Sequence, residues 1–199
     1  LGADLIVAFD ECTPFHVEKK YTEQSMKRSH RWEKRSLEAF IQYNDFSQAL
    51  YGIVQGGVYP DLRKQSAEFV SENPFFATAI GGSLGATKEQ MYEVVGMALE
   101  YLDKSRPIHL LGIGGIADIF NGVAQGIDTF DCVHPTRIAR HGGALVKKKY
   151  RDNENREHIN LKRSEYKCND DPIEGDCDCV TCQTFSRAYL HYLLKANTS

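Results

Sequence analysis

Three cysteines crowd into the short run Cys177-x-Cys179-x-x-Cys182, in a chain that has six cysteines altogether. Thiolates at this spacing can converge on one tetrahedral ion, which needs a fourth ligand as well. A secreted disulfide scaffold is smaller and denser in cysteine, so a metal site in a reducing compartment is favoured. His191, the nearest downstream histidine, is either the fourth ligand or an ordinary histidine on a helix surface. The pattern predicts one structural Zn²⁺ per chain and a cytoplasmic protein.

Carboxylates follow two short apolar runs, Asp10 after residues 5–9 and Asp131 after Thr129-Phe130. A carboxylate at the end of a strand can act as a nucleophile or bind an N–H-rich ligand, although each aspartate alone is also explained as a loop cap. Gln55 and the backbone around Gly81-Gly82 add donors and acceptors that suit the edge of a planar base. Together these residues indicate a polar site that binds a base.

Five apolar runs predict the strands that must position these residues: 5–9, 50–54, 76–80, 108–113 and 129–133. Each run is nearly continuous, which is typical of a parallel sheet buried on both faces. Helix patterns separate the runs at 25–43, 87–102 and 116–126, and Thr87 with Gln90 forms a capping box. This alternation predicts an α/β fold built from right-handed β-α-β units.

Polar or glycine-rich residues follow all five runs. A site contributed by every strand is typical of a (β/α)8 TIM barrel, which is therefore favoured over an open sheet. Five units do not close such a barrel, and the chain does not begin with Met, so we expect three further strands upstream. The run Gly112-x-Gly114-Gly115 lacks the third glycine of a dinucleotide fingerprint and is discounted.

After Pro135 the pattern changes. Residues 1–135 are predicted to form part of the barrel, and residues 136–199 an appended subdomain with the cysteine cluster and a helix at 184–195. Its basic residues are either a solvated face or a polyanion-binding face, and their place directly after the Asp131 motif favours the polyanion. They are Arg137, Arg140, Lys147, Lys148, Lys149, Arg151, Arg156, Lys162 and Arg163.

The composition is that of an ordinary globular protein, with 199 residues, 42% hydrophobic and 26% charged residues, and a net charge of -3. Apolar runs stay well below the roughly 20 residues of a membrane span. The first nine residues lack the basic start of a signal peptide. The sequence therefore predicts neither a membrane nor a secreted protein.

In this order the motifs resemble the tRNA-guanine transglycosylase family, and the resemblance covers essentially the whole chain. The matching runs are Phe9-Asp10-Glu11-Cys12-Thr13-Pro14, Gly52-Ile53-Val54-Gln55-Gly56-Gly57, Ala79-Ile80-Gly81-Gly82, Leu110-Leu111-Gly112-Ile113-Gly114, 126–133 with Pro135-Thr136-Arg137, and the cysteine cluster with Ser186-Arg187-Ala188-Tyr189.

The resemblance implies a (β/α)8 barrel with a zinc subdomain that exchanges guanine at the anticodon wobble position of tRNA for a 7-deazaguanine, preQ1 or queuine, in the queuosine pathway. Asp131 would attack the ribose C1′ and form a covalent intermediate, as carboxylates do in retaining glycosidases. The base would be bound by Asp10, Cys12, Gln55, Gly81, Gly82 and Leu111. RNA contacts are implied at Gly112, Ile113, Gly114, Gly115, Ile116, Ala117, Asp118, Thr136, Arg137, Ile138, Ala139 and Arg140. The zinc would be held by Cys177, Cys179 and Cys182, and the protein would be a homodimer.

The sequence departs from the family pattern at several places. The family's Asp-Ser-Gly-Gly motif, with a second catalytic aspartate, is absent, and the segment 83–86 lacks a glutamate that helps to select the base. Gly115-Ile116-Ala117 replaces a lysine-proline stretch. The family's fourth zinc ligand, a histidine, is expected beyond Ser199, which excludes His191.

These departures lead us to expect that the given segment is inactive alone. A non-catalytic tRNA-binding paralogue is the alternative within the fold, although retention of Asp10 and Asp131 argues against it. An unrelated metabolic barrel enzyme with a zinc knob is a second alternative.

Overall fold

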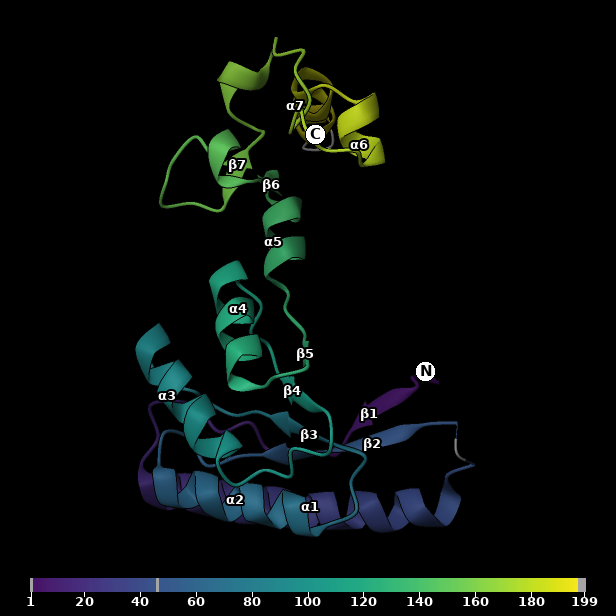
Figure 1. The fold of residues 1–199 in the computed structure, drawn as a ribbon, viewed down its shortest axis with the longest axis vertical. Helices are drawn as coiled ribbons and strands as arrows, with labels where there is room; N and C mark the ends of the chain where they lie inside the picture. Colours follow the sequence, from purple (N-terminus) through teal and green to yellow (C-terminus); the bar gives the residue numbers. More distant parts are fainter. Residues whose placement is uncertain (1, 46, 197–199) are drawn as a thin grey trace. The chain divides into compact units, whose positions relative to one another are not determined.

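The computed structural model describes residues 2–45 and 47–196, which belong to two compact units, Leu1–Cys132 and Val133–Ser199. The first unit is built on a five-stranded parallel sheet whose strands are neighbours in chain order (Figure 1). Its strands are β1 (Leu5–Val7), β2 (Ala49–Val54), β3 (Ala77–Ile80), β4 (Ile108–Leu110) and β5 (Thr129–Phe130). Four helices connect them: α1 (Lys19–Tyr43), α2 (Pro60–Glu72), α3 (Lys88–Leu99) and α4 (Ile116–Gln125).

All four helices lie on one side of the sheet (Figure 1). Strands in chain order with helices on a single side are the arrangement of a barrel, whereas a doubly wound sheet carries helices on both faces. The predicted α/β class and parallel sheet are therefore confirmed, and the curled sheet fits part of a barrel.

Alternation along the strands divides the apolar side chains between two clusters. The side chains that face the helices include Leu50, Val54, Ile80 and Leu110, all buried in the main core. The residues between them face the other side, where Tyr51, Ile53, Ala77 and Ala79 pack with Leu111. Because Gln55 continues the alternation of Tyr51 and Ile53, the second face leads directly to the candidate site.

The predicted capping box at Thr87 is confirmed. The Thr87 hydroxyl accepts a hydrogen bond from the backbone N–H of Gln90 at 3.2 Å, and α3 begins at the next residue. Helix α1 begins at Lys19, six residues before the predicted start, because the polar residues of its first turns gave no apolar periodicity.

Helix α4 ends at Gly126 as predicted, where a φ of 102° suits glycine. Its apolar stripe is largely exposed, however: Phe120 is 74% and Val123 57% accessible in this structure. The helix predicted at 116–126 is therefore present, with part of its apolar face accessible among the residues described.

The second unit is smaller. It contains α5 (His134–Arg140), an antiparallel pair of β6 (Gly143–Leu145) and β7 (His158–Asn160), short 3-10 turns η1 (Lys148–Tyr150) and η2 (Ser164–Tyr166), and helices α6 (Val180–Thr184) and α7 (Arg187–Ala196). Its core consists of Val146, Ile159, Leu161 and Tyr166. The helix predicted at 184–195 corresponds to α7, which begins three residues later, at Arg187, while the short helix α6 precedes it and ends at Thr184. No helix within the described ranges is long and apolar enough to cross a membrane.

Candidate functional site

Asp10 lies just beyond β1 and faces Gln55, which follows β2. The Gln55 side-chain amide donates a hydrogen bond of 2.5 Å to the Asp10 carboxylate. Partial burial raises the pKa of Asp10, although this hydrogen bond opposes the shift. Gln55 itself is fully buried, and its Oε1 has no hydrogen-bond partner among the described residues. The pair therefore combines a partly exposed carboxylate with an amide that orients it.

The loop that carries Asp10 is fastened to α1. The backbone N–H of Glu11 donates to Ser29 Oγ at 2.9 Å, and the Thr13 and Ser25 hydroxyls are 2.6 Å apart. The Glu11 carboxylate forms an ion pair with Arg28. Between these anchors Cys12 is exposed, so Asp10 and Cys12 project from a loop that is held on both sides.

Gly82 approaches the Asp10–Gln55 pair so closely that no side chain fits there. Its φ of 74° lies in the left-handed region, and a Cβ at this position would stand 2.4 Å from Gln55 Oε1. Gly81 is close to Leu111, whose methyl group would be 3.2 Å from an added Cβ. The predicted base-binding residues are thus brought together in one part of the first unit.

The side chain of Arg63, from α2, supports the backbone around Gly81 and Gly82. The sequence gave no indication of this role. Its fully buried guanidinium donates hydrogen bonds of 2.7 to 3.0 Å to the carbonyl oxygens of Gly57, Val54, Gly81 and Ser83. Burial lowers the pKa of Arg63, because it removes the charged guanidinium from water. One side chain therefore joins the segments that follow β2 and β3.

Asp131 follows β5, and its side chain is 56% exposed. One oxygen, Oδ1, accepts the backbone N–H of Gly112 at 2.8 Å and lies 3.1 Å from Nε2 of His109. The other ring nitrogen of His109 is 2.8 Å from the Thr129 hydroxyl. This arrangement holds an accessible carboxylate in place through one of its oxygens, and the role of Asp131 as a nucleophile stays a prediction.

His109 was missed because it sits inside an apolar run that was interpreted only as a strand. A signal existed: His109 and Leu111 lie two residues apart and share one face of the sheet, and Thr129 is the register partner of His109 in β5. A polar residue on that face, next to a strand-end aspartate, was the available indication.

The segment 112–118, predicted to contact RNA, leads from β4 into α4. Gly114 packs against Cys132, where an added Cβ would be 2.4 Å from the cysteine Cβ. Asp118 is buried, and its carboxylate is bound by Lys88 at 2.9 Å and by the Tyr92 hydroxyl at 2.7 Å. The Asp118 side chain thus joins α4 to α3, which leaves the preceding residues as the exposed part of the segment.

The other segment predicted to contact RNA, 136–140, forms most of α5 in the second unit. Beside it lies a hollow of about 250 Å³ that is lined by His134, Arg137, Ile138, His141, Gly143, His158 and Asn160. Three imidazoles and a guanidinium are groups that donate hydrogen bonds to phosphate and base oxygens. The histidines were not singled out in the sequence because they are spread over 25 residues.

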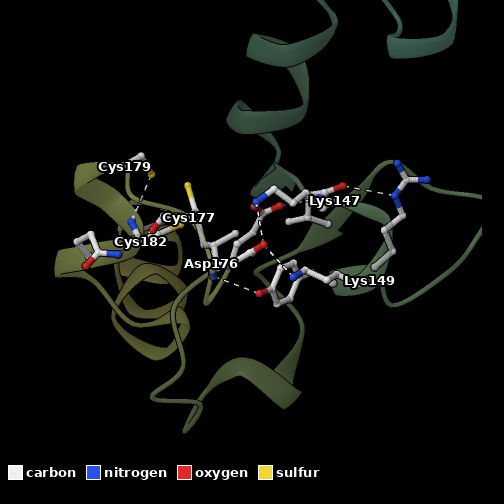
Figure 2. Close-up of polar contacts among 12 residues, drawn as sticks. Lys147, Lys149, Asp176, Cys177, Cys179 and Cys182 are labelled. Atoms are coloured by element: carbon white, nitrogen blue, oxygen red, sulfur yellow. Dashed lines mark hydrogen bonds and ion pairs between the residues drawn. The ribbon is translucent and has the colours of Figure 1, made fainter.

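The three clustered cysteines meet in the second unit (Figure 2). Their sulfur atoms all lie within 4.8 Å of one another, a separation compatible with Zn–S bonds of about 2.3 Å after a small contraction. The backbone N–H of Cys182 points at Cys179 Sγ, which lowers the pKa of Cys179, while burial raises the pKa of Cys182 to about 11. The cluster could therefore hold a metal ion.

His191 is outside this cluster. Its ring is buried, and Nδ1 donates a hydrogen bond of 2.8 Å to the carbonyl oxygen of Leu161. Both interpretations of His191 from the residues alone, a fourth ligand and a surface histidine, are wrong, because the ring packs into the core of the second unit.

Part of the basic run is neutralised by acidic neighbours. Asp176 lies between Lys147, at 3.2 Å, and Lys149, at 2.8 Å, as Figure 2 shows. These pairs lower the pKa of Asp176, which directly precedes Cys177. The two lysines thus connect η1 to the cysteine loop. Arg163 is also paired, with Glu165 at 3.1 Å and Asp152 at 3.5 Å, so the polyanion-binding hypothesis concerns the remaining basic residues of the run.

Comparison with known proteins gives a consistent result. The family model described as queuine tRNA-ribosyltransferase matches residues 1–199. The chain belongs to this family. Curated relatives with that name include one from Roseiflexus sp. strain RS-1, 47% identical over 206 residues, and one from Protochlamydia amoebophila, 46% identical over 196 residues. Each alignment covers 98% of this chain and 50% or 48% of the relative. A third, from Natranaerobius thermophilus, is 44% identical and is covered to 51%.

The resemblance predicted from the ordered motifs is therefore confirmed. The chain spans about half the length of the curated relatives that it matches. In barrels, ligands bind at the edge where the carboxyl ends of the parallel strands meet. The residues that follow these strands are therefore the candidates for the ligand-binding site in this member of the queuine tRNA-ribosyltransferase family.

One further buried group in this family member was not predicted. Glu33 of α1 accepts the backbone N–H of Ile53 at 3.0 Å through Oε2. Burial, with a contribution from the charge of Asp10, raises the pKa of Glu33 to about 8. Its Oε1 has no hydrogen-bond partner among the described residues. The Glu33 carboxyl group thus continues the hydrogen bonding of β2 beyond the last residue of β1.

Proposed function

We propose that this chain is part of a tRNA-guanine transglycosylase, which exchanges guanine at the wobble position of tRNA for a 7-deazaguanine of the queuosine pathway. One observation carries the proposal: the accessible Asp131 carboxylate belongs to the same unit as the closely packed group of Asp10, Gln55 and Gly82. Membership of the queuine tRNA-ribosyltransferase family indicates which reaction these residues would carry out. Residues 1–135 would be the part of an eight-stranded barrel that contributes five of its β/α units.

Asp131 acts as the nucleophile in this proposal. Its free oxygen attacks C1′ of the ribose, the bond between C1′ and N9 of guanine breaks, and guanine leaves with the bonding electrons and takes up a proton. The incoming 7-deazaguanine loses a proton from N9 and attacks C1′, which breaks the bond to Asp131. The hydrogen bond from Gly112 steadies the carboxylate throughout, because it is made by the backbone.

The base is recognised by groups around Asp10. The partly exposed carboxylate accepts N–H groups of the base edge, and Gln55 keeps it oriented. The backbone at Gly81-Gly82 can approach the base closely because neither residue has a side chain. Cys12 and Leu111 complete the proposed site, with Leu111 as an apolar surface for stacking.

The RNA around the target nucleotide is bound by residues 112–118 and 136–140. Arg137 and Arg140 of α5 are the charged groups of the second segment, and the histidine-lined hollow beside Arg137 supports this assignment. Arginine in such a position binds phosphate or base edges.

Cys177, Cys179 and Cys182 are proposed to hold one structural zinc ion, with a further protein ligand completing the tetrahedron. The donor set supports this assignment, because three thiolates are typical of closed structural sites. The ion would stabilise the loop that joins Asp176 to α6, and it would take no part in base exchange.

A homodimer and a cytoplasmic location complete the proposal. The second unit presents a partly apolar hollow of about 510 Å³, whose lining includes Leu161, Leu190, Leu193 and Leu194. A second copy of the chain could cover this surface. Light scattering of the purified protein would show a dimer, and a monomer at micromolar concentration would contradict this part of the proposal.

Covalent trapping tests the activity. The full-length protein is incubated with tRNA, denatured, and examined for a protein–RNA adduct. We expect an adduct with the wild type and none with Asp131→Ala. Asp61→Asn, which changes an exposed carboxylate in the first turn of α2, should form as much adduct as the wild type.

Exchange of labelled guanine, with and without tRNA, distinguishes the alternatives. A tRNA-binding paralogue would bind tRNA but exchange no base, and a metabolic barrel enzyme would not respond to tRNA. Adduct formation by Asp131→Ala would overturn the proposal.

A further inference from the structure

Asp131 is held asymmetrically, and the asymmetry comes from its neighbours on the sheet. Within the part of the chain that the structure describes, hydrogen bonds reach Oδ1 only, from Gly112 N–H at 2.8 Å and His109 Nε2 at 3.1 Å. Oδ2 is therefore the oxygen left for another partner. Because both hydrogen bonds end on the same oxygen, they favour one rotamer of the Asp131 side chain.

The protonation of His109 follows from its two partners. An ionised carboxylate only accepts hydrogen bonds, so Nε2 must carry a proton. In the neutral ring Nδ1 is then an acceptor, and the Thr129 hydroxyl, at 2.8 Å, donates to it. Thr129 thus selects the ring form that can donate to Asp131.

The orientation of the ring is also fixed by packing. His109 belongs to β4 and pairs in register with Thr129 of β5, so the two side chains stand next to each other on one face of the sheet. The Tyr51 ring meets the imidazole edge-on at 6.2 Å between centroids. The only charged group that these contacts bring to the ring is Asp131.

We propose that His109 is a positioning residue for Asp131: held by Thr129, it fixes Oδ1 through Nε2–H so that Oδ2 is presented to the ribose C1′. The inference rests on the proposed function, because it assigns the attacking oxygen of the proposed nucleophile. Without the His109 donor, Oδ1 is held by the Gly112 N–H alone, so the carboxylate can rotate and Oδ2 is aligned for a smaller fraction of the time, whereas binding of the tRNA does not depend on this alignment. Removal of the His109 donor should therefore slow the covalent step.

Amide side chains provide a matched pair of variants. In glutamine the amide nitrogen extends about as far from the backbone as Nε2 of histidine, whereas in asparagine it extends only as far as Nδ1. His109→Gln therefore keeps a donor for Asp131, and His109→Asn does not. His109→Phe removes both ring nitrogens and keeps the ring, and Thr129→Val removes only the hydroxyl that fixes the tautomer.

The measurement is the single-turnover rate of adduct formation by the full-length protein at saturating tRNA, together with KM for tRNA. The loss of one hydrogen bond to a charged group predicts a rate about 10- to 100-fold lower for His109→Phe and His109→Asn, with KM within about twofold of the wild type. His109→Gln should recover most of the rate, and Thr129→Val should lie between.

Three results would overturn the inference: an unchanged rate in His109→Phe, a loss confined to KM, or equal rates in the glutamine and asparagine variants. Asp131→Ala is measured in parallel. If it forms adduct, the proposed function fails; if it does not and His109→Phe is as fast as the wild type, only the role of His109 fails. Thermal unfolding of each variant, with the glutamine and asparagine proteins compared directly, excludes a general loss of folding as the cause.

Discussion

Glu33 makes the stability of this protein depend on pH in an unusual direction. Its pKa of about 8 exceeds the ordinary value of 4.5, because burial penalises the charged form. A group whose pKa is raised by folding stabilises the folded state below its unfolded pKa. That contribution is lost as the pH rises through the folded pKa. Stability should therefore fall between about pH 4.5 and pH 8.

The two pKa values set the size of the effect. They differ by 8 − 4.5 = 3.5 units, and one unit corresponds to about 1.4 kcal/mol. The full difference is about 5 kcal/mol, which is an upper bound because water and small movements relieve part of the burial penalty. Glu33→Gln removes the ionisation and can still accept the N–H of Ile53 through its amide oxygen.

Urea denaturation between pH 5 and pH 9 measures this effect. Trp32, the single tryptophan, precedes Glu33 on α1 and reports the unfolding by fluorescence. At pH 5 the free energies of unfolding of Glu33→Gln and the wild type should agree within about 1 kcal/mol. At pH 9 the variant should be more stable by about 2 to 5 kcal/mol. Glu38→Gln, an exposed position on the same helix, should follow the wild type at every pH.

A difference between Glu33→Gln and the wild type that stays constant from pH 5 to pH 9 would refute the reasoning. It would mean that Glu33 titrates at the same pH in the folded and unfolded states, and that its burial has no electrostatic cost.

Three further predictions follow from the same region and from the cysteine cluster. Arg63→Met should lower the free energy of unfolding by about 3 to 5 kcal/mol in urea, since four carbonyl oxygens lose a buried charged donor, whereas exposed Lys64→Met should change it little. Gly82→Ala should raise KM for the base at least about tenfold, because the new methyl group displaces Gln55; an unchanged KM would place the base elsewhere. A chelator should release one zinc per chain by metal analysis and speed hydrogen exchange at residues 176–184, and Cys182→Ser should bind no zinc; a metal-free wild type would contradict the site.

The sequence predicted the candidate site where its residues follow strands. Asp10 and Asp131 could be found because the carboxyl ends of parallel strands gather at one edge, whatever the details of packing. Thr87 marked the start of α3 because a capping side chain acts within its own turn. Local chemistry and the alternation of strands and helices were sufficient for these elements.

Other residues depend on contacts between distant parts of the chain. Glu33 and Arg63 look like ordinary charged positions on helices, and only the folded unit shows that both are buried against backbone groups. His109 is hidden within an apolar strand. In α4 the periodic pattern identified an apolar stripe correctly, but periodicity does not state what covers it, and Phe120 is exposed among the described residues.

The four hydrogen bonds of Arg63 have a consequence for how this family can diverge. They end on carbonyl oxygens, which every amino acid carries. Two of these oxygens belong to Ser83, the first residue of the segment 83–86 that departs from the family pattern, and to Gly81, two residues before it. Side chains in that segment can therefore be exchanged during evolution while the path of the backbone stays anchored. If this segment selects the base, as the proposed function implies, preference for one deazapurine over another can drift by substitution there with little risk to folding, for as long as Arg63 is retained.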